Sequence, residues 1–360
     1  MKNGRNIIDY AANEFRSFLD FPPNEVDYAI FALLSYFDFS VFLPLYGDSI
    51  SFSDMYDLSK KDAFLKRVSY TENDDLLFSS VFGNPRFKHV IALRYEHFFF
   101  PASEEQFAAI SFYLPTGEEV IAFRGTDASL IGWKEDFNLC SDTPLESQID
   151  AAKYLRKELH YSNKSLSLVG HSKGGNLASY CYFSSSETER KRIRSVYSFD
   201  GPGFSNEMRK LLHPVNDEKY FHLVPEESII GQLYNESTFS ISIQSDAHHI
   251  YQHSLYRWLV DENSFLRARF INPSYKKWMV SFNEWAKKTP LEDRHFLVNT
   301  IYECIVSSKI KNAKELRESL PSSLLRIRKE IKRLPEEQVE RLRKICDAFP
   351  YVLKVLFFPK

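Results

Sequence analysis

A serine flanked by glycines, in the run Gly-His-Ser-Lys-Gly at residues 170–174, carries the strongest chemical signal in the sequence. This pattern places a serine on a sharp strand-to-helix turn, where small residues two positions away let the chain pass closely. The strand-like run Ser-Leu-Ser-Leu-Val precedes it, and a run suited to a helix follows from near Gly175. The sequence therefore predicts that Ser172 is a hydrolase nucleophile; the alternative is an ordinary glycine-rich turn.

A serine nucleophile needs a base, and in folds with this turn the triad residues occur in the order serine, acid, histidine. His253 lies just after the last predicted strand and before an apolar helical run. That position predicts His253 as the base, with His248 and His249 as alternatives.

The acid is less well defined by the sequence. Asp200 ends the predicted strand at 194–199, whereas Glu226 and Glu227 follow the predicted strand at 219–224. Each could also be an ordinary turn or loop charge. The choice between Asp200 and the pair of glutamates stays open.

Two segments could stabilise the oxyanion. The run Ile-Ala-Phe-Arg-Gly-Thr-Asp at 121–127 is a strand ending in Gly-Thr, which can place the amide and hydroxyl of Thr126 near a reacting carbonyl. The backbone N–H of Lys173 follows the nucleophile directly. We expect the Lys173 side chain to reach solvent or to pair with an acid such as Asp200; the alternative is that it binds an anionic part of the substrate.

These residues need a sheet to position them. Three strand-like runs in succession predict an antiparallel start, and the later strands alternate with helices, which predicts a largely parallel sheet covered on both faces. A capping box at Thr143–Glu146 predicts the start of a helix. The expected fold class is α/β, of the α/β-hydrolase type, with a mostly parallel central sheet flanked by helices. The expected regions are a helical lead-in at 1–88 packed on the core, the core at 89–260 and a helical C-terminal region at 261–360.

Several motifs together resemble known families. AFRGT, then W-x-x-D, then GHSxGG is similar to the class 3 (fungal-type) lipases. GHSKGGN, FDGPGF, VPEESIIG and NEVDYAIFALLSYFDF resemble a family of poorly characterised bacterial lipase-like α/β-hydrolases, over roughly residues 20–260. The resemblance implies that Thr126 is an oxyanion donor and that Arg124 pairs with Asp136. It also implies a lipid or long-chain acyl ester as substrate.

The same resemblance bears on the base and the acid. The related family has a Q-H-x-x-x-W pattern, matched here by Gln252, His253 and Trp258 with one extra residue before the tryptophan. The glutamates at 226 and 227 stand where class 3 lipases keep an aspartate.

Composition limits the other function classes. A net charge of -2 gives no reason to expect nucleic acid. The four cysteines are scattered, and no metal-ligand spacing or phosphate loop is evident, so we expect no cofactor. The absence of a signal-peptide pattern and of a long apolar run predicts a cytoplasmic location; the alternative is export by a route that leaves no such signal. The expected enzyme class, a serine esterase, follows from the predicted nucleophile. The sequence does not predict the oligomeric state.

The alternative function is a non-catalytic binding or interaction protein built on a hydrolase fold. Residues 309–344 contain 12 Lys or Arg against 6 Asp or Glu, so the C-terminal helices could contact an anionic partner such as a membrane surface.

Overall fold

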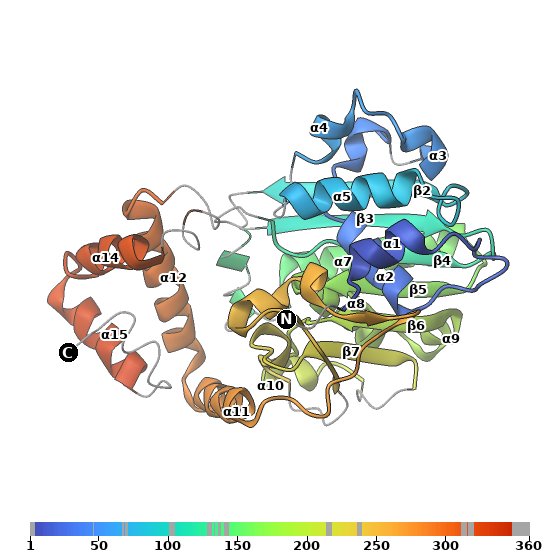
Figure 1. The fold of residues 1–360 in the computed structure, drawn as a ribbon. Helices are drawn as coiled ribbons and strands as arrows, with labels where there is room; N and C mark the ends of the chain where they lie inside the picture. Colours follow the sequence, from blue (N-terminus) through green and yellow to red (C-terminus); the bar gives the residue numbers. More distant parts are fainter. Residues whose placement is uncertain are drawn as a thin grey trace.

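A central sheet organises the protein, as the computed structural model shows (Figure 1). The described residues contribute eight strands to it. Strands β1 to β8 lie across it in chain order; neighbours from β1 to β4 are antiparallel and those from β4 to β8 are parallel. Both the antiparallel start and the parallel remainder were predicted, and the α/β fold class is confirmed. The strands are β1 Ser49–Ser51, β2 Ile91–Phe100, β3 Glu105–Tyr113, β4 Glu119–Phe123, β5 Leu166–His171, β6 Ile193–Phe199, β7 Tyr220–Pro225 and β8 Ser240–Ile243. The structure describes residues 4–45, 47–66, 68, 71–100, 105–127, 132, 134–135, 138–139, 144–213, 218–235, 240–310, 315 and 320–347.

Helices α7 (Glu146–Tyr161) and α8 (Lys173–Ser184) cover one face of the sheet. Successive parallel strands are joined by right-handed crossovers. When each new strand is added on the same side of the previous one, the connecting helices all lie on the same face of the sheet. Leu155 of α7, Leu177 of α8 and Leu168 of β5 share one buried cluster on this side. The connections therefore leave the opposite face uncovered.

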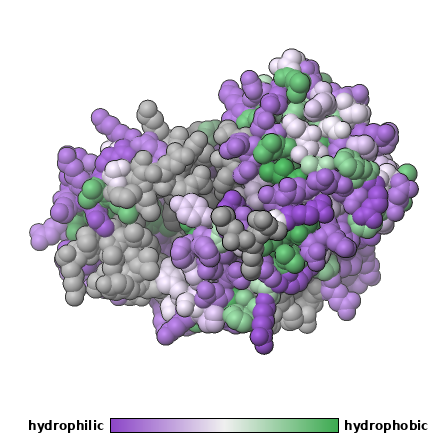
Figure 2. Space-filling view, in the orientation of Figure 1, coloured by the Kyte–Doolittle hydropathy of each residue, from purple (hydrophilic) through white to green (hydrophobic). Residues whose placement is uncertain are grey.

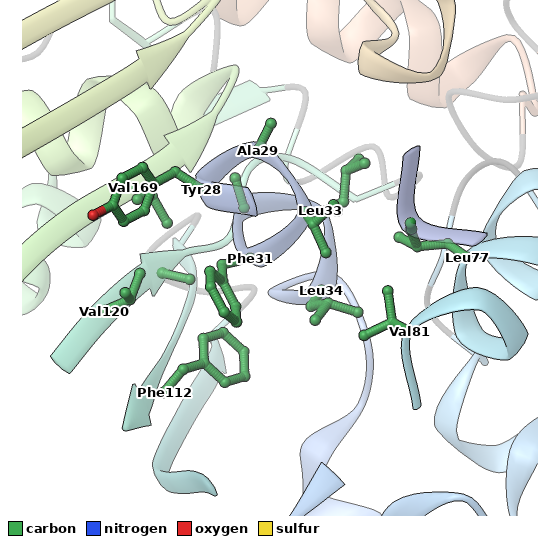
Figure 3. Packing of buried hydrophobic residues seen from close by; sticks show 14 of the residues in the cluster. Tyr28, Ala29, Phe31, Leu33, Leu34, Leu77, Val81, Phe112, Val120 and Val169 are labelled. Atoms are coloured by element: carbon green, nitrogen blue, oxygen red, sulfur yellow. The ribbon is translucent and has the colours of Figure 1, made fainter. Parts of the chain in front are cut away.

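Helix α2 (Glu25–Leu34) covers that opposite face, and all of its residues after Glu25 are buried. Asn24 caps it, as its side-chain oxygen accepts hydrogen bonds from the first-turn amides. Figure 3 shows Phe31 pointing toward Phe112 and Val120 of the sheet, with the Phe31 and Phe112 ring centroids 5.0 Å apart. Apart from Asp27, the buried residues of α2 are apolar, which suits a helix that lies between the sheet and the flanking helices α1 (Ile7–Asn13) and α5 (Thr71–Phe82).

The predicted capping box at the start of α7 is wrong. The helix begins at Glu146, and the Leu145 amide donates to Gln148 Oε1 at 3.0 Å. Gln148 therefore accepts the hydrogen bond from the backbone N–H of the cap residue, which the sequence pattern had assigned to Glu146. Thr143 lies outside the described residues.

In the C-terminal region, the described residues form four long helices: α11 (Pro273–Lys288), α12 (Leu291–Ser307), α14 (Leu320–Ile331) and α15 (Glu336–Asp347). They have a hydrophobic cluster of their own, and α12, α14 and α15 stand to one side of the sheet (Figure 1). Hydrophilic side chains dominate the described surface of the protein in the same view (Figure 2). Within the described residues, no helix combines the length and apolar character needed to cross a membrane.

Shorter elements complete the part of the chain that the structure describes. They are the helices α3 Phe52–Met55, α4 Lys61–Phe64, α9 Glu187–Arg192 and α10 Asn206–Arg209, the 3-10 helices η1 Phe39–Val41, η3 Ile230–Gln232, η4 His249–His253 and η5 Leu255–Arg257, and the two-stranded sheet of β9 Val260–Asp261 and β10 Ser264–Phe265.

Candidate active site

Ser172 occupies the turn between the end of β5 and the start of α8 (Figure 1). Its backbone has φ 58° and ψ -127°, a left-handed conformation that costs energy for a residue other than glycine. Its amide donates to the carbonyl oxygen of Phe199 at 2.9 Å, which anchors the turn to the neighbouring strand β6. The local geometry is therefore the strained turn that the sequence pattern predicts, with Ser172 partly exposed.

The flanking glycines are required by close backbone contacts. A Cβ at Gly170 would collide with the carbonyl oxygen of Gly174, and a Cβ at Gly174 would collide with the carbonyl oxygen of Phe123. Strand β5 thus crosses the first turn of α8 with no room for a side chain. The same contacts press α8 against the end of β4.

Asp200 is placed beside the serine by the register of the parallel strands. His171, the last residue of β5, pairs with Phe199, the last residue of β6, so Ser172 and Asp200 leave the sheet at the same level. Asp200 also has a positive φ, 48°, and its amide donates to the carbonyl oxygen of Leu223 at 2.8 Å.

His253 contacts Asp200 directly. Its Nδ1 lies 2.7 Å from Asp200 Oδ2, and since a carboxylate accepts, Nδ1–H donates. The other carboxylate oxygen accepts from Ser228 Oγ at 2.5 Å and from the Gly231 amide at 3.1 Å. Asp200 is thus buried and held on both oxygens, whereas His253 is partly open, and its Nε2 is left with a lone pair that can take a proton.

His171 ties the serine turn to the histidine. Its Nε2–H donates to the carbonyl oxygen of His253 at 2.7 Å, and its Nδ1 lies 3.1 Å from the Tyr36 hydroxyl, which donates to it. The rings of His171 and His253 lie with centroids 4.6 Å apart. Burial, together with the smaller effect of the neighbouring His253, lowers the pKa of His171 to about 3, so His171 stays neutral. No hydrogen bond links Ser172 Oγ to His253 among the described residues, which is common in enzymes without substrate.

The glutamates considered for the acid lie elsewhere. The Glu227 amide donates to Gln252 Oε1 at 2.8 Å, and its Oε2 accepts from the His249 amide at 2.7 Å. The Glu226 amide donates to the carbonyl oxygen of Ile243 at 3.0 Å. Of the three candidate acids, Asp200 is the one in contact with His253. Glu227 instead holds the segment that leads to His253.

His248 and His249, the alternatives for the base, are largely exposed. Their Nδ1 atoms lie 3.7 and 3.8 Å from Glu227 Oε2, away from the Asp200 carboxylate that His253 contacts.

Both predicted oxyanion donors lie next to the turn. Lys173 is the first residue of α8, so its amide has no partner within the helix. Thr126 follows Gly125, where an added Cβ would lie 2.6 Å from the His171 carbonyl oxygen and would overlap the Tyr36 side chain. The strand end that carries Thr126 is therefore pressed directly against the serine turn.

The Lys173 side chain pairs with an acid, as one of the two expectations had it, but the acid is Glu135 rather than Asp200, and the side chain does not reach solvent. It is 1% exposed, and its Nζ donates to Glu135 Oε2 at 2.6 Å and to the carbonyl oxygen of Gln106 at 2.7 Å. With both acceptors in place and no exposure, it is not positioned to bind an anionic substrate group either.

The expected pair of Arg124 and Asp136 cannot be compared with the structure, because Asp136 lies outside the described residues. Arg124 is buried, and none of its guanidinium nitrogens has a hydrogen-bond partner among the residues that the structure describes. Its amide donates to the carbonyl oxygen of Ala108 at 2.9 Å, which fixes the end of β4 on β3.

Sequence reasoning missed three residues that shape the site: His171, Tyr36 and Ser228. His171 and Ser228 lie inside the motifs GHSKGGN and VPEESIIG, yet nothing in their spacing indicates a partner. Tyr36 is 135 residues from His171, a separation at which a single sequence carries no signal.

The described residues contain no group of three or more histidine, cysteine or acidic side chains arranged to hold a metal. A serine on a strained strand-to-helix turn, beside an aspartate at the next strand end that is hydrogen-bonded to a histidine, is an arrangement typical of the α/β-hydrolase class. The pattern of the Mbeg1-like family matches residues 81–303, more than half of the chain. The chain therefore belongs to the Mbeg1-like family, which is lipase-like. No curated protein gives a significant match.

Proposed function

We propose that the protein is a serine hydrolase that cleaves carboxylic esters through an acyl-enzyme on Ser172. The observation that carries the proposal is the 2.7 Å hydrogen bond from His253 Nδ1 to Asp200 Oδ2, beside the strained turn that presents Ser172. A buried carboxylate that fixes the tautomer of a histidine makes the opposite ring nitrogen a general base. Membership of a lipase-like family supports the same reading.

In the acylation step, Ser172 Oγ attacks the ester carbonyl carbon while His253 Nε2 takes the hydroxyl proton. The carbonyl oxygen gains the negative charge and accepts hydrogen bonds from the amides of Lys173 and Thr126. Collapse of this intermediate breaks the carbon–oxygen bond to the alcohol, which leaves with the proton held by His253. Asp200 stays ionised and stabilises the imidazolium throughout.

In the deacylation step, water replaces the serine as nucleophile. His253 takes a proton from the water, whose oxygen forms the new bond to the acyl carbon. The proton returns to Ser172 Oγ as the ester bond to the enzyme breaks, which releases the carboxylic acid and restores the free serine.

We further propose that the acyl group is apolar. Ile250 and Tyr251 are 42% and 65% exposed, and both belong to the short helix η4 that ends at His253. Large apolar side chains exposed beside a catalytic base favour an apolar substrate surface. We expect esters of longer acyl chains to be hydrolysed with a lower KM than acetate esters, and Tyr251→Ser to reduce that difference.

The test is covalent labelling with a fluorophosphonate probe together with hydrolysis of a panel of p-nitrophenyl acyl esters. We expect the wild-type protein to be labelled and the variant Ser172→Ala to be neither labelled nor active. Ser184→Ala, at the far end of the same helix α8, is a matched control and should behave like wild type. Wild type that is not labelled, or labelling that persists in Ser172→Ala, would contradict the proposal and favour a non-catalytic binding role.

A further inference from the structure

A buried ion pair lies beside the serine turn and has no part in the proposed chemistry. Lys173 Nζ lies 2.6 Å from Glu135 Oε2, with the two side chains 1% and 3% exposed. The same Glu135 oxygen accepts from the Gln106 amide at 3.0 Å, and Lys173 Nζ also donates to the Gln106 carbonyl oxygen. We call Lys173, Glu135 and Gln106 the lysine brace.

The brace reaches the strand end that carries the second oxyanion donor. Gln106 Oε1 accepts a hydrogen bond from the Asp127 amide at 3.2 Å, and Asp127 directly follows Thr126. Lys173 is therefore joined to both sides of the oxyanion site. Its backbone amide is one of the two donors. Its side chain contacts Gln106, which in turn binds Asp127, the residue that follows the second donor, Thr126.

We propose that the Lys173 side chain is a positioning residue that holds the two oxyanion donors at a fixed separation. This inference rests on the proposed function and deepens it. Donors aimed at a developing charge are effective only when they are held in place before the reaction, so their support matters for rate. The ammonium group acts on the geometry of the Thr126 segment and does not touch the substrate.

A purely structural ion pair predicts a different result. Replacing both partners of a buried pair with neutral residues of similar volume is often neutral for stability, because no charge is left unpaired. A variant that removes both charges therefore separates stability from positioning. If the pair only stabilises the fold, the rate should survive in a folded double variant.

The experiment uses the full chain with Lys173→Met and Glu135→Gln combined. Gln keeps an oxygen that can accept from the Gln106 amide. We expect kcat for p-nitrophenyl butyrate to fall about 10- to 100-fold with KM nearly unchanged, since complete loss of one donor costs about 100- to 1000-fold. The matched control removes the exposed pair of Lys191 and Glu187 on α9, whose 2.8 Å contact should not affect turnover.

Hydrogen exchange gives a readout that does not need turnover. In the variant that lacks both charges of the brace, we expect the Asp127 amide to exchange at least about tenfold faster. Its acceptor, Gln106 Oε1, is then no longer fixed by the contacts of Gln106 with Lys173 and Glu135. Exchange in strand β5 should not change. If wild type proves inactive on all esters, the proposed function fails, but faster exchange at Asp127 still supports the brace and unchanged exchange overturns it.

Gln106→Leu provides a second variant in case the double variant does not fold. It leaves the Lys173–Glu135 contact intact and removes only the link to the Asp127 amide, so it should also lower kcat. A folded double variant with kcat within about twofold of wild type would overturn the inference. So would a rise in KM confined to anionic esters, which would make Lys173 a substrate receptor.

Discussion

His253 Nδ1 and Asp200 Oδ2 lie 2.7 Å apart although 53 residues separate them in the chain. The contact depends on the parallel register of β5 and β6, which brings Asp200 to the level of Ser172. It also depends on Ser228 and Gly231, which hold the second carboxylate oxygen and leave Oδ2 facing the imidazole. The arrangement fixes the orientation of the His253 imidazole, as the proposed proton transfer requires.

Replacing Asp200 with Asn should lower kcat by about 10⁴-fold with little change in KM, because the amide no longer fixes the tautomer or stabilises the imidazolium. Initial rates with p-nitrophenyl butyrate would measure the effect. The matched control is Glu227→Gln, which keeps an oxygen to accept from the His249 amide and should remain close to wild type. A larger loss in Glu227→Gln than in Asp200→Asn would transfer the acid role to the glutamate.

His171→Leu should lower kcat by about 10- to 100-fold, because the buried carbonyl of His253 loses its donor, a change worth about 1–3 kcal/mol. His171→Gln can still donate a hydrogen bond to this carbonyl and should retain more activity. Proton NMR of the His253 Nδ1–H signal would report the position of the ring without substrate. Equal kcat values in the two variants would show that the loss of activity does not come from the missing hydrogen-bond donor to the His253 carbonyl.

How far the sequence predicts the structure depends on how local each feature is. The serine turn is encoded within a few residues, since Gly170 and Gly174 exclude side chains at two backbone contacts. The strands follow from alternation, with Val120 facing the α2 side and Ile121 the α7 and α8 side. Such patterns can be read from a single chain.

Contacts between distant segments could not be predicted in this way. Whether Asp200 or the glutamates meet His253 depends on how three separate loops come together. The partner of Lys173 is Glu135, 38 residues away, which occupies one of the two unspecified positions of the W-x-x-D motif. The error at the start of α7 has a different origin, because Gln148 competes with Glu146 for the same capping role and neither choice is decided by spacing alone.

The stability of the protein should depend on pH through His171. Burial lowers its pKa to about 3 in the folded protein, against about 6.5 when unfolded. Between these values only the unfolded chain binds the proton, so His171 removes about 1.4 kcal/mol of folding stability for each pH unit below about 6.5. The destabilisation caused by His171→Gln should therefore shrink as the pH falls from 7 to 5.

The variant must be compared with wild type at each pH, because another buried group changes the pH dependence of folding stability in the opposite direction. Burial raises the pKa of the Glu158 carboxyl, so the stability that it contributes is present at low pH and is lost as the pH rises. The difference between wild type and His171→Gln cancels this contribution. Urea denaturation at pH 7, 6 and 5 would measure it, and a difference that does not vary with pH would contradict the prediction.

The N-terminal helices should be essential for stability, because α2 covers a sheet face that no crossover helix reaches. Arg86 binds Asp27 of α2 through two contacts, at 2.9 and 2.6 Å, with neither side chain exposed. Arg86→Met leaves a buried carboxylate unpaired and should cost about 3–5 kcal/mol of unfolding free energy, measured by urea denaturation. Adding Asp27→Asn should recover part of the loss. Arg16→Met, which breaks an exposed ion pair with Glu14 and a cation–π contact with Phe21, is the control and should have little effect. A loss as large as that of Arg86→Met would mean that burial of the pair is not the cause.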